Sequence, residues 1–241
     1  MCSFPIDSYL EDILNSVDSC GSVILKAEPG VGKTTRLPMH IIKNREARVL
    51  VIEPRRVAAK LPATFLADQL GEPVGNSVGY KVRFENKSTN DTRLLFMTDG
   101  MAVKHLSKPD FLATYDYVIF DEFHERTLNS DLALCLSHLI KNRNNLNLKT
   151  IIMSATLDVD VVLSKVPEAK VFHIKGELHG VVVEYLEPIG REMPEDHVVR
   201  ALEKIESRKD LTGNILVFLT GRAEINRVIQ FVEGKFGESY E

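Results

Sequence analysis

A glycine-rich turn followed by Lys33 and Thr34 is the segment of this sequence with the clearest chemical capability. It lies between an apolar run at 22–26 and a helical pattern at 33–44. Backbone N–H groups of such a turn point at phosphate oxygens, and the positive end of the helix dipole adds to the attraction. A lysine at this spacing reaches the β and γ phosphates of a nucleotide, and the threonine hydroxyl ligates magnesium. The expected nucleotide-binding residues are Glu28, Gly30, Val31, Gly32, Lys33, Thr34 and Thr35.

A second candidate segment is acidic and follows the apolar run Tyr117–Phe120. Asp121 would hold magnesium together with Thr34, since magnesium prefers hard oxygen ligands and keeps several waters. Glu122 is placed to take a proton from an attacking water. An Asp-Glu pair at a strand end is by itself equally typical of a solvated turn, and the phosphate loop upstream favours the functional interpretation. The predicted catalytic residues are Lys33, Asp121, Glu122 and His124.

Short strands alternate with helices along the first part of the chain. Strands are expected at 22–26, 48–52, 77–84, 93–97, 117–120 and 149–153, and helices at 33–44, 57–70, 98–106 and 130–141. This alternation predicts an α/β fold with a parallel sheet and helices on both faces. Sites in such sheets lie at the carboxyl ends of the strands, which is where both candidate segments fall.

The pattern changes after residue 169. Two β-rich stretches at 171–174 and 181–186 precede a linker with Pro188, Gly190 and Pro194. A helix at 197–208, a strand at 215–219 and a helix at 222–233 are expected beyond it. One strand and two helices cannot bury a sheet of their own. We therefore expect a first domain at 1–188 and a truncated second domain at 189–241.

Composition limits the possible classes of protein. Of the 241 residues, 44% are hydrophobic and 27% charged, which is ordinary for a cored globular protein, and the net charge of −4 argues against nucleic-acid binding through bulk charge. Three scattered cysteines without metal spacing indicate a reducing compartment. No apolar run is long enough for a bilayer and the N-terminus lacks the order of a signal peptide, so we expect no membrane association, no secretion, and residence in cytoplasm or nucleus.

Six sequence blocks in a fixed order carry a family resemblance. They are Gly32-Lys33-Thr34-Thr35, Glu53-Pro54-Arg55-Arg56-Val57-Ala58-Ala59, Val78-Gly79-Tyr80 with Arg83-Phe84, Met97-Thr98-Asp99-Gly100-Met101, Asp121-Glu122-Phe123-His124-Glu125-Arg126 and Met153-Ser154-Ala155-Thr156-Leu157. Together they resemble the DEAH-box branch of superfamily 2 RNA helicases, over about residues 6–233.

The resemblance implies a RecA-like P-loop NTPase lobe and the start of a second one, with ATP and Mg²⁺ bound between lobes and RNA across the top. It implies RNA-stimulated ATP hydrolysis, 3′-to-5′ movement and a possible protein activator. The segment Leu216–Gly221 matches the opening strand of the second lobe. By position, the RNA-binding residues are Arg55, Arg56, Thr98, Asp99 and Gly100, which contact the backbone and read no sequence, and the coupling residues are Ser154, Ala155 and Thr156. Without the resemblance, an exposed helix start is a less favoured alternative for the two arginines, and a plain helix cap is an alternative for the Ser-Ala-Thr segment.

The sequence departs from the family pattern in three places. Ala27 opens the phosphate loop instead of glycine, Phe123 replaces the usual alanine, and Phe65 stands where the family has an arginine against the base. No Gln/Arg-rich motif of the second lobe occurs, and an arginine finger typically contributes ~10³ or more in rate. Weak turnover is therefore expected. The alternative is a catalytically weak module that binds nucleotide, RNA or a partner; a P-loop kinase or transport ATPase does not account for the Pro-Arg-Arg, Thr-Asp-Gly and Ser-Ala-Thr blocks.

Overall fold

The computed structural model describes residues 4–108, 110–156, 159–176, 181–208 and 213–237. The chain divides into two compact units, one up to residue 178 and one from residue 179. Within the described ranges, no helix combines the length and the apolar character that crossing a bilayer requires.

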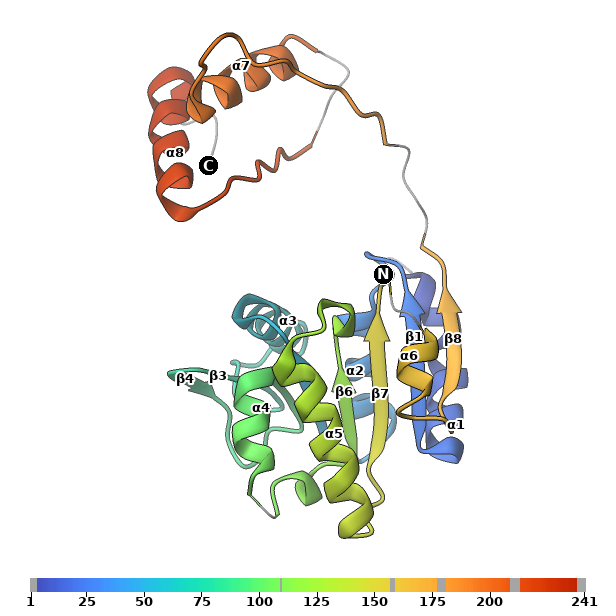
Figure 1. The fold of residues 1–241 in the computed structure, drawn as a ribbon. Coiled ribbons are helices and arrows are strands. Elements are labelled where there is room, and N and C mark those ends of the chain that lie inside the picture. Colours follow the sequence, from blue (N-terminus) through green and yellow to red (C-terminus); the bar gives the residue numbers. More distant parts are fainter. Residues whose placement is uncertain (1–3, 109, 157–158, 177–180, 209–212, 238–241) are drawn as a thin grey trace. The chain divides into compact units, whose positions relative to one another are not determined.

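The first unit is built on one eight-stranded sheet with the order β4-β3-β5-β2-β6-β7-β1-β8 (Figure 1). All neighbouring strands run parallel except β3 and β4. The strands are β1 Ser22–Ala27, β2 Val49–Glu53, β3 Val78–Val82, β4 Glu85–Lys87, β5 Leu94–Thr98, β6 Tyr117–Phe120, β7 Lys149–Ser154 and β8 Lys170–Ile174. The predicted α/β fold is thereby confirmed.

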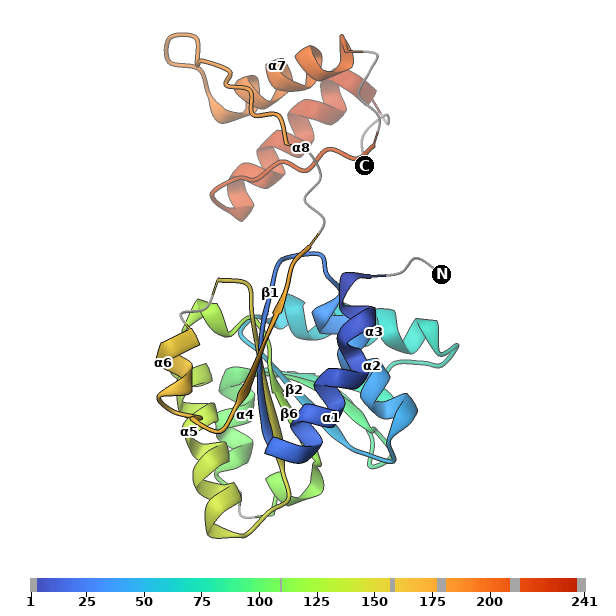
Figure 2. The same ribbon diagram turned by 90° about the vertical axis from the view of Figure 1, so that its right-hand side faces the viewer.

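Helices cover both faces of this sheet, which Figure 2 shows edge-on. On one face lie η1 Pro5–Tyr9, α1 Leu10–Cys20, α2 Lys33–Asn44 and α3 Arg56–Gln69; on the other lie α4 Asp99–Leu106, η2 Leu112–Thr114, η3 Phe123–Glu125, α5 Leu128–Arg143 and α6 Val159–Leu163. Alternate residues of the buried strands divide between the two cores. Val23 and Leu25 of β1 join the first core, and Ile24 joins the second.

A single strand was expected at 77–84, but the structure has a hairpin of two strands, β3 and β4, in this region. The chain reverses at Phe84, which has a φ of 68°, and β4 pairs antiparallel with β3. Glu85 explains the reversal, because its carboxylate accepts a hydrogen bond from the Tyr80 hydroxyl and pairs with Lys60 Nζ at 2.8 Å. Alternation of apolar residues cannot indicate this tie to helix α3.

The second unit contains α7 Pro194–Glu206 and α8 Arg222–Phe236 among its described residues. These helices pack through Val199, Leu202, Val228 and Val232. The strands expected at 181–186 and 215–219 are wrong for this structure, since neither stretch has regular secondary structure. The second stretch overlaps the matched Leu216–Gly221 segment. A strand needs a hydrogen-bonded neighbour, and the β-type side chains here face solvent: Tyr185 is 85% and Phe218 87% exposed.

Candidate nucleotide-binding site

Five neighbouring strands end in polar residues at the same edge of the sheet. The order β5-β2-β6-β7-β1 brings together the residues at their carboxyl ends. These are Thr98 at the end of β5, Glu53 at the end of β2, Asp121 after β6, Ser154 at the end of β7 and the phosphate loop after β1. The expectation that the two catalytic segments meet at one edge is thus realised in the geometry.

The phosphate loop depends on two glycines. Gly30 and Gly32 adopt φ values of +81° and +91°, in the left-handed region that L residues with side chains avoid. At Gly32 a Cβ would also lie 2.9 Å from Arg36 Cγ and 3.0 Å from Phe4 Cγ. Val31 is fully buried, and its carbonyl accepts the Ile6 N–H at 3.3 Å. Val31 therefore anchors the loop to the protein core, while Gly30 and Gly32 line a cavity on its exposed side.

Lys33 and Thr34 meet the two carboxylates of the acidic segment. Lys33 Nζ lies 3.0 Å from Glu122 Oε1, and only 6% of the residue is exposed. The Thr34 hydroxyl donates a hydrogen bond to Asp121 Oδ2. Both side chains belong to the first turn of α2, where the helix dipole favours anions. The four groups predicted to bind phosphate and magnesium and to carry out the reaction therefore form one cluster.

Glu122 occupies a strained backbone conformation at this cluster. Its φ of 48° and ψ of 35° are left-handed, which non-glycine residues adopt only when the surroundings hold them there. The Asp121 carboxylate does so by accepting the Glu122 N–H at 2.7 Å. His124 Nδ1 lies 3.3 Å from Glu122 Oε2. The acidic turn thus aims the Glu122 carboxylate at Lys33 and keeps His124 beside it.

Two buried carboxyl groups make this edge electrostatically unusual. Burial raises the pKa of Asp121 despite its hydrogen bond from Thr34 and the nearby Lys33 charge. Burial, followed by the charges of Asp121 and Glu122, raises the pKa of Glu53 well above its ordinary value. Glu53 is 1% exposed and neither of its carboxyl oxygens has a hydrogen-bond partner within the described residues. Lys33 is the positive charge that acts on both carboxyl groups, and it does not offset the effect of their burial on the pKa.

That donor set fits magnesium. The Thr34 hydroxyl and the Asp121 carboxylate are hard oxygen ligands in contact with each other, and the unpartnered Glu53 carboxyl lies on the next strand. The described residues contain no group of three or more His, Cys, Asp or Glu side chains arranged to hold a metal. Magnesium does not need such a cage, because it keeps several waters and shares ligands with phosphate oxygens.

A cavity of about 300 Å³ opens above these groups. It is lined by Phe4, Pro29, Gly30, Gly32, Lys33, Thr34, Thr35 and Glu122. Glu28 was expected to bind the nucleotide, but its carboxylate accepts the Gly176 N–H at 3.0 Å, which ties the loop to the end of β8. Its side chain therefore supports the loop from behind.

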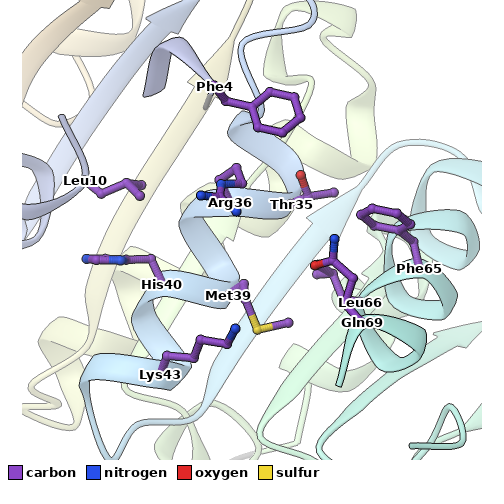
Figure 3. A pocket seen from close by; sticks show the side chains of 10 residues that line it. All are labelled: Phe4, Leu10, Thr35, Arg36, Met39, His40, Lys43, Phe65, Leu66 and Gln69. Carbon is purple, nitrogen blue, oxygen red and sulfur yellow. The ribbon is translucent and has the colours of Figure 1, made fainter. Parts of the chain in front are cut away.

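A second cavity of about 230 Å³ shares Phe4 and Thr35 with the first. Figure 3 shows the rings of Phe4 and Phe65 on either side of Thr35. Phe65 is 51% exposed, so an aromatic face stands where the family resemblance leads one to expect a guanidinium. Arg36 also lines this cavity, but its guanidinium is held by the Asp7 carboxylate at 2.7 and 2.9 Å.

The residues expected to bind RNA lie on two segments. Arg55 and Arg56 are exposed at the start of α3, and Arg55 Nε lies 3.2 Å from the Glu125 carboxylate of the acidic segment. Thr98 and Asp99 are nearly buried where β5 joins α4, whereas Gly100 is exposed.

The Asp99 carboxylate is occupied inside the protein. It accepts hydrogen bonds from the Thr127 hydroxyl, from Ser130 Oγ at 3.4 Å and from the Gly100 N–H at 2.5 Å. Its side chain therefore fixes α4 against α5.

The coupling candidates lie at the end of β7. Ser154 is fully buried and its hydroxyl has no partner among the described residues, Ala155 is half-buried and Thr156 is exposed. Phe123 is 3% exposed and packs edge-on against Phe120 with ring centroids 6.1 Å apart. The substitution at Phe123 therefore fills the core and leaves the carboxylates in place.

Sequence reasoning gave no role to Glu53, Glu125 or Thr127. Glu53 belongs to the second block of the resemblance. Its carboxylate at the end of a strand could have indicated a site residue, because that strand pairs with the strand that precedes Asp121. Thr127, whose side chain accepts the Ser130 N–H, is an N-cap signal before α5.

Comparison with known proteins decides the family. The model of the DEAD/DEAH box helicase family matches residues 8–163. This chain belongs to the DEAD/DEAH box helicases. It is 36% identical over 239 residues to the ATP-dependent RNA helicase HrpB of Escherichia coli and 34% identical over 233 residues to the ATP-dependent RNA helicase DHX33 of Mus musculus. The crystal structure of the Escherichia coli DEAH/RHA helicase HrpB superposes with a TM-score of 0.84 at 35% identity over 96% of this chain. The first unit has the RecA-like fold of these helicases.

The chain covers only part of these relatives. It spans 29% of HrpB and 33% of mouse DHX33, and 30% of the HrpB chain in the crystal structure. The family match therefore applies to residues 8–163 of the first unit, and the activity of a whole helicase does not follow from it.

Proposed function

We propose that this chain is the Mg-ATP-binding and hydrolysing part of a DEAH-type RNA helicase. The observation that carries the proposal is a single cavity lined by Lys33, Thr34 and Glu122, with Asp121 hydrogen-bonded to Thr34 beneath it. Lys33 at the end of the phosphate loop lies 3.0 Å from Glu122, so the expected phosphate ligand and the expected general base are neighbours, as transfer of a phosphoryl group to water requires.

Each residue then has a defined task in the reaction. The loop N–H groups and Lys33 bind the β and γ phosphates and neutralise charge that builds up on them. When a nucleotide binds, its phosphate oxygens replace the Glu122 carboxylate as the partner of Lys33 Nζ. Glu122 is then free to accept the proton of the attacking water. The strained turn at Glu122 holds the carboxylate in position before substrate arrives.

Thr34 and Asp121 would hold magnesium, which would supply positive charge to the phosphate oxygens and to the buried carboxyl groups. The raised pKa values of Asp121 and Glu53 support this assignment, because both groups are placed where a cation would stabilise their charged forms.

RNA binding is proposed for the exposed arginines Arg55 and Arg56 and for the Thr98–Gly100 segment, through backbone phosphates. Because Asp99 is held by Thr127 and Ser130, we assign its carboxylate to positioning this segment. Ser154 and Thr156 are proposed to couple the nucleotide state to RNA.

The chain from about residue 189 is proposed to begin a second RecA-like lobe. A protein activator, and residence in cytoplasm or nucleus, remain predictions.

The deciding experiment is calorimetric titration of Mg-ATP into the wild-type chain, Lys33→Ala and a matched control, Lys87→Ala, on exposed β4. We expect binding by the wild type and the control, and loss of at least about tenfold in affinity for Lys33→Ala, since a charge-assisted phosphate contact contributes ~1.5–3 kcal/mol. Equal heats in all three proteins would refute the site. An ATPase assay with and without oligouridine then separates a hydrolase from the alternative of a weak binding module.

A further inference from the structure

A cluster of basic side chains lies away from the nucleotide cavity, between β3 and the end of α4. It comprises Lys81 in β3, Lys104 and His105 in the last turn of α4, and Lys108 just beyond. Lys104, His105 and Lys108 lie outside all six blocks of the family resemblance, and Lys81 falls between the two parts of the third block. We refer to them as the α4 basic cluster.

The sheet register places Lys81 on the α4 face. Lys81 is paired with Met97 of β5, and neighbouring residues in a parallel pair point to the same face. Met97 belongs to the core that contains Ala102 and Leu106 of α4, while Tyr80 and Val82 on either side of Lys81 belong to the opposite core. The Lys81 ammonium therefore emerges beside α4, near Lys104 and Lys108.

Among the described residues, no carboxylate neutralises this cluster. Burial and then the charges of Lys108 and Lys104 lower the pKa of Lys81, and no carboxylate opposes them. Burial, Lys81, Lys108 and Lys104 lower the pKa of His105 to about 4, again with no acidic contribution. Within the described part of the chain, the three lysines form no ion pair, whereas basic side chains elsewhere are paired, for example Arg36 with Asp7 and Arg126 with Asp131.

Uncompensated like charges are maintained at a stability cost unless an anion binds there. His105 stays neutral near pH 7 and packs on Phe111 with ring centroids 5.0 Å apart, so it shapes the surface between the lysines. Three ammonium groups without acids, on a chain of net charge −4, are a local site for phosphates.

We propose that the α4 basic cluster binds phosphates of single-stranded RNA and extends the RNA-binding surface along α4. The proposal rests on the proposed RNA binding by Thr98–Gly100. These residues begin the helix whose other end carries the cluster, and its eight residues measure about 12 Å. A strand that follows α4 would contact both ends, which favours RNA over an isolated anion.

The test is fluorescence anisotropy of labelled oligouridine at several KCl concentrations. Three proteins are compared: the wild type, the cluster variant Lys104→Ala/Lys108→Ala and the control variant Lys43→Ala/Lys165→Ala. The control removes the same charge from exposed positions on other elements. Each phosphate contact on a single strand contributes ~0.7 to the slope of log K against log[KCl], so losing two contacts should reduce the magnitude of that slope by about 1.4. Between 1 M and 0.1 M KCl, the cluster variant should therefore gain about 25-fold less affinity than the wild type. The control should retain the wild-type slope, and Lys104→Arg/Lys108→Arg should restore it.

The outcomes separate this proposal from the proposed function. If the wild type binds RNA and the cluster variant matches the control, the cluster proposal is refuted while the proposed function stands. If the wild type binds no RNA at any salt, the cluster proposal and the proposed RNA contacts of Thr98–Gly100 both fail, while Mg-ATP binding is decided by the calorimetric titration. A cluster variant with unchanged RNA slope but weaker binding of polyglutamate would show an acidic protein as the ligand and would also refute it. Equal melting temperatures of the two double variants exclude a structural explanation, and Lys81→Met should reduce the slope by about half as much.

Discussion

The buried carboxyl of Glu53 should make the stability of this chain depend on pH, and Glu53→Gln should remove that dependence. Glu53 is 1% exposed, lacks hydrogen-bond partners within the described residues, and has a pKa well above its ordinary value of 4.5. Above about pH 5 the unfolded chain releases this proton while the folded chain keeps it. Unfolding then releases a proton, so stability falls as pH rises towards the folded-state pKa. The slope for one group is at most ~1.4 kcal/mol per pH unit.

Urea unfolding of the wild type and Glu53→Gln from pH 4.5 to 8 measures this slope. Asp121 is present in both proteins, so the difference between the two curves reports Glu53 together with its electrostatic coupling to Asp121. We expect Glu53→Gln to match the wild type at the acid end and to become the more stable protein as pH rises. Glu46→Gln, at an exposed position, controls for the lost formal charge. Parallel curves at all pH values would show that Glu53 is solvated or paired, and the electrostatic account of the site would be wrong.

Three further predictions concern the same unit. Glu122→Gln should keep Mg-ATP binding and lower single-turnover hydrolysis by ~10²–10⁴, as loss of a general base does; unchanged hydrolysis would exclude that role. Thr127→Val removes the N-cap of α5 and the hydroxyl that bonds to Asp99, so urea unfolding should show a loss of about 1–3 kcal/mol, against little change for Thr64→Val on the exposed face of α3. Gly32→Ala should abolish Mg-ATP binding in calorimetry, because its Cβ meets Arg36 and Phe4 at a φ of +91°, whereas Gly234→Ala in α8 meets nothing within 4 Å and should be neutral.

The sheet and the main site could be predicted because both follow from local patterns. Apolar runs at 22–26, 117–120 and 149–153 correspond closely to β1, β6 and β7. Parallel strands align their carboxyl ends, so the segments after β1 and β6 had to meet at one edge once the sheet was recognised. The strand order, with β6 and β7 between β2 and β1, could not be read from the apolar runs alone.

Roles that depend on a particular tertiary partner were beyond the sequence pattern. Glu28 has the right position for a phosphate-loop residue, yet its carboxylate is bonded to Gly176, 148 positions along the chain. Asp99 belongs to a segment expected to contact RNA, and its carboxylate is bonded to Thr127 and Ser130. A residue type and its spacing state what a side chain can do, and only the packing of distant elements decides which partner it takes.

The second unit shows the same principle for secondary structure. The stretches 181–186 and 215–219 have the β-branched and aromatic residues of strands, but β propensity expresses how well a side chain fits a pleated, half-buried surface. Both stretches lie exposed beside helices α7 and α8, whose own apolar faces meet through Val199 and Val228. Helices form their backbone hydrogen bonds internally, whereas a strand requires a neighbour. The helices of this unit therefore form as expected while its strand-like segments do not, since no described strand lies next to them to complete a ladder.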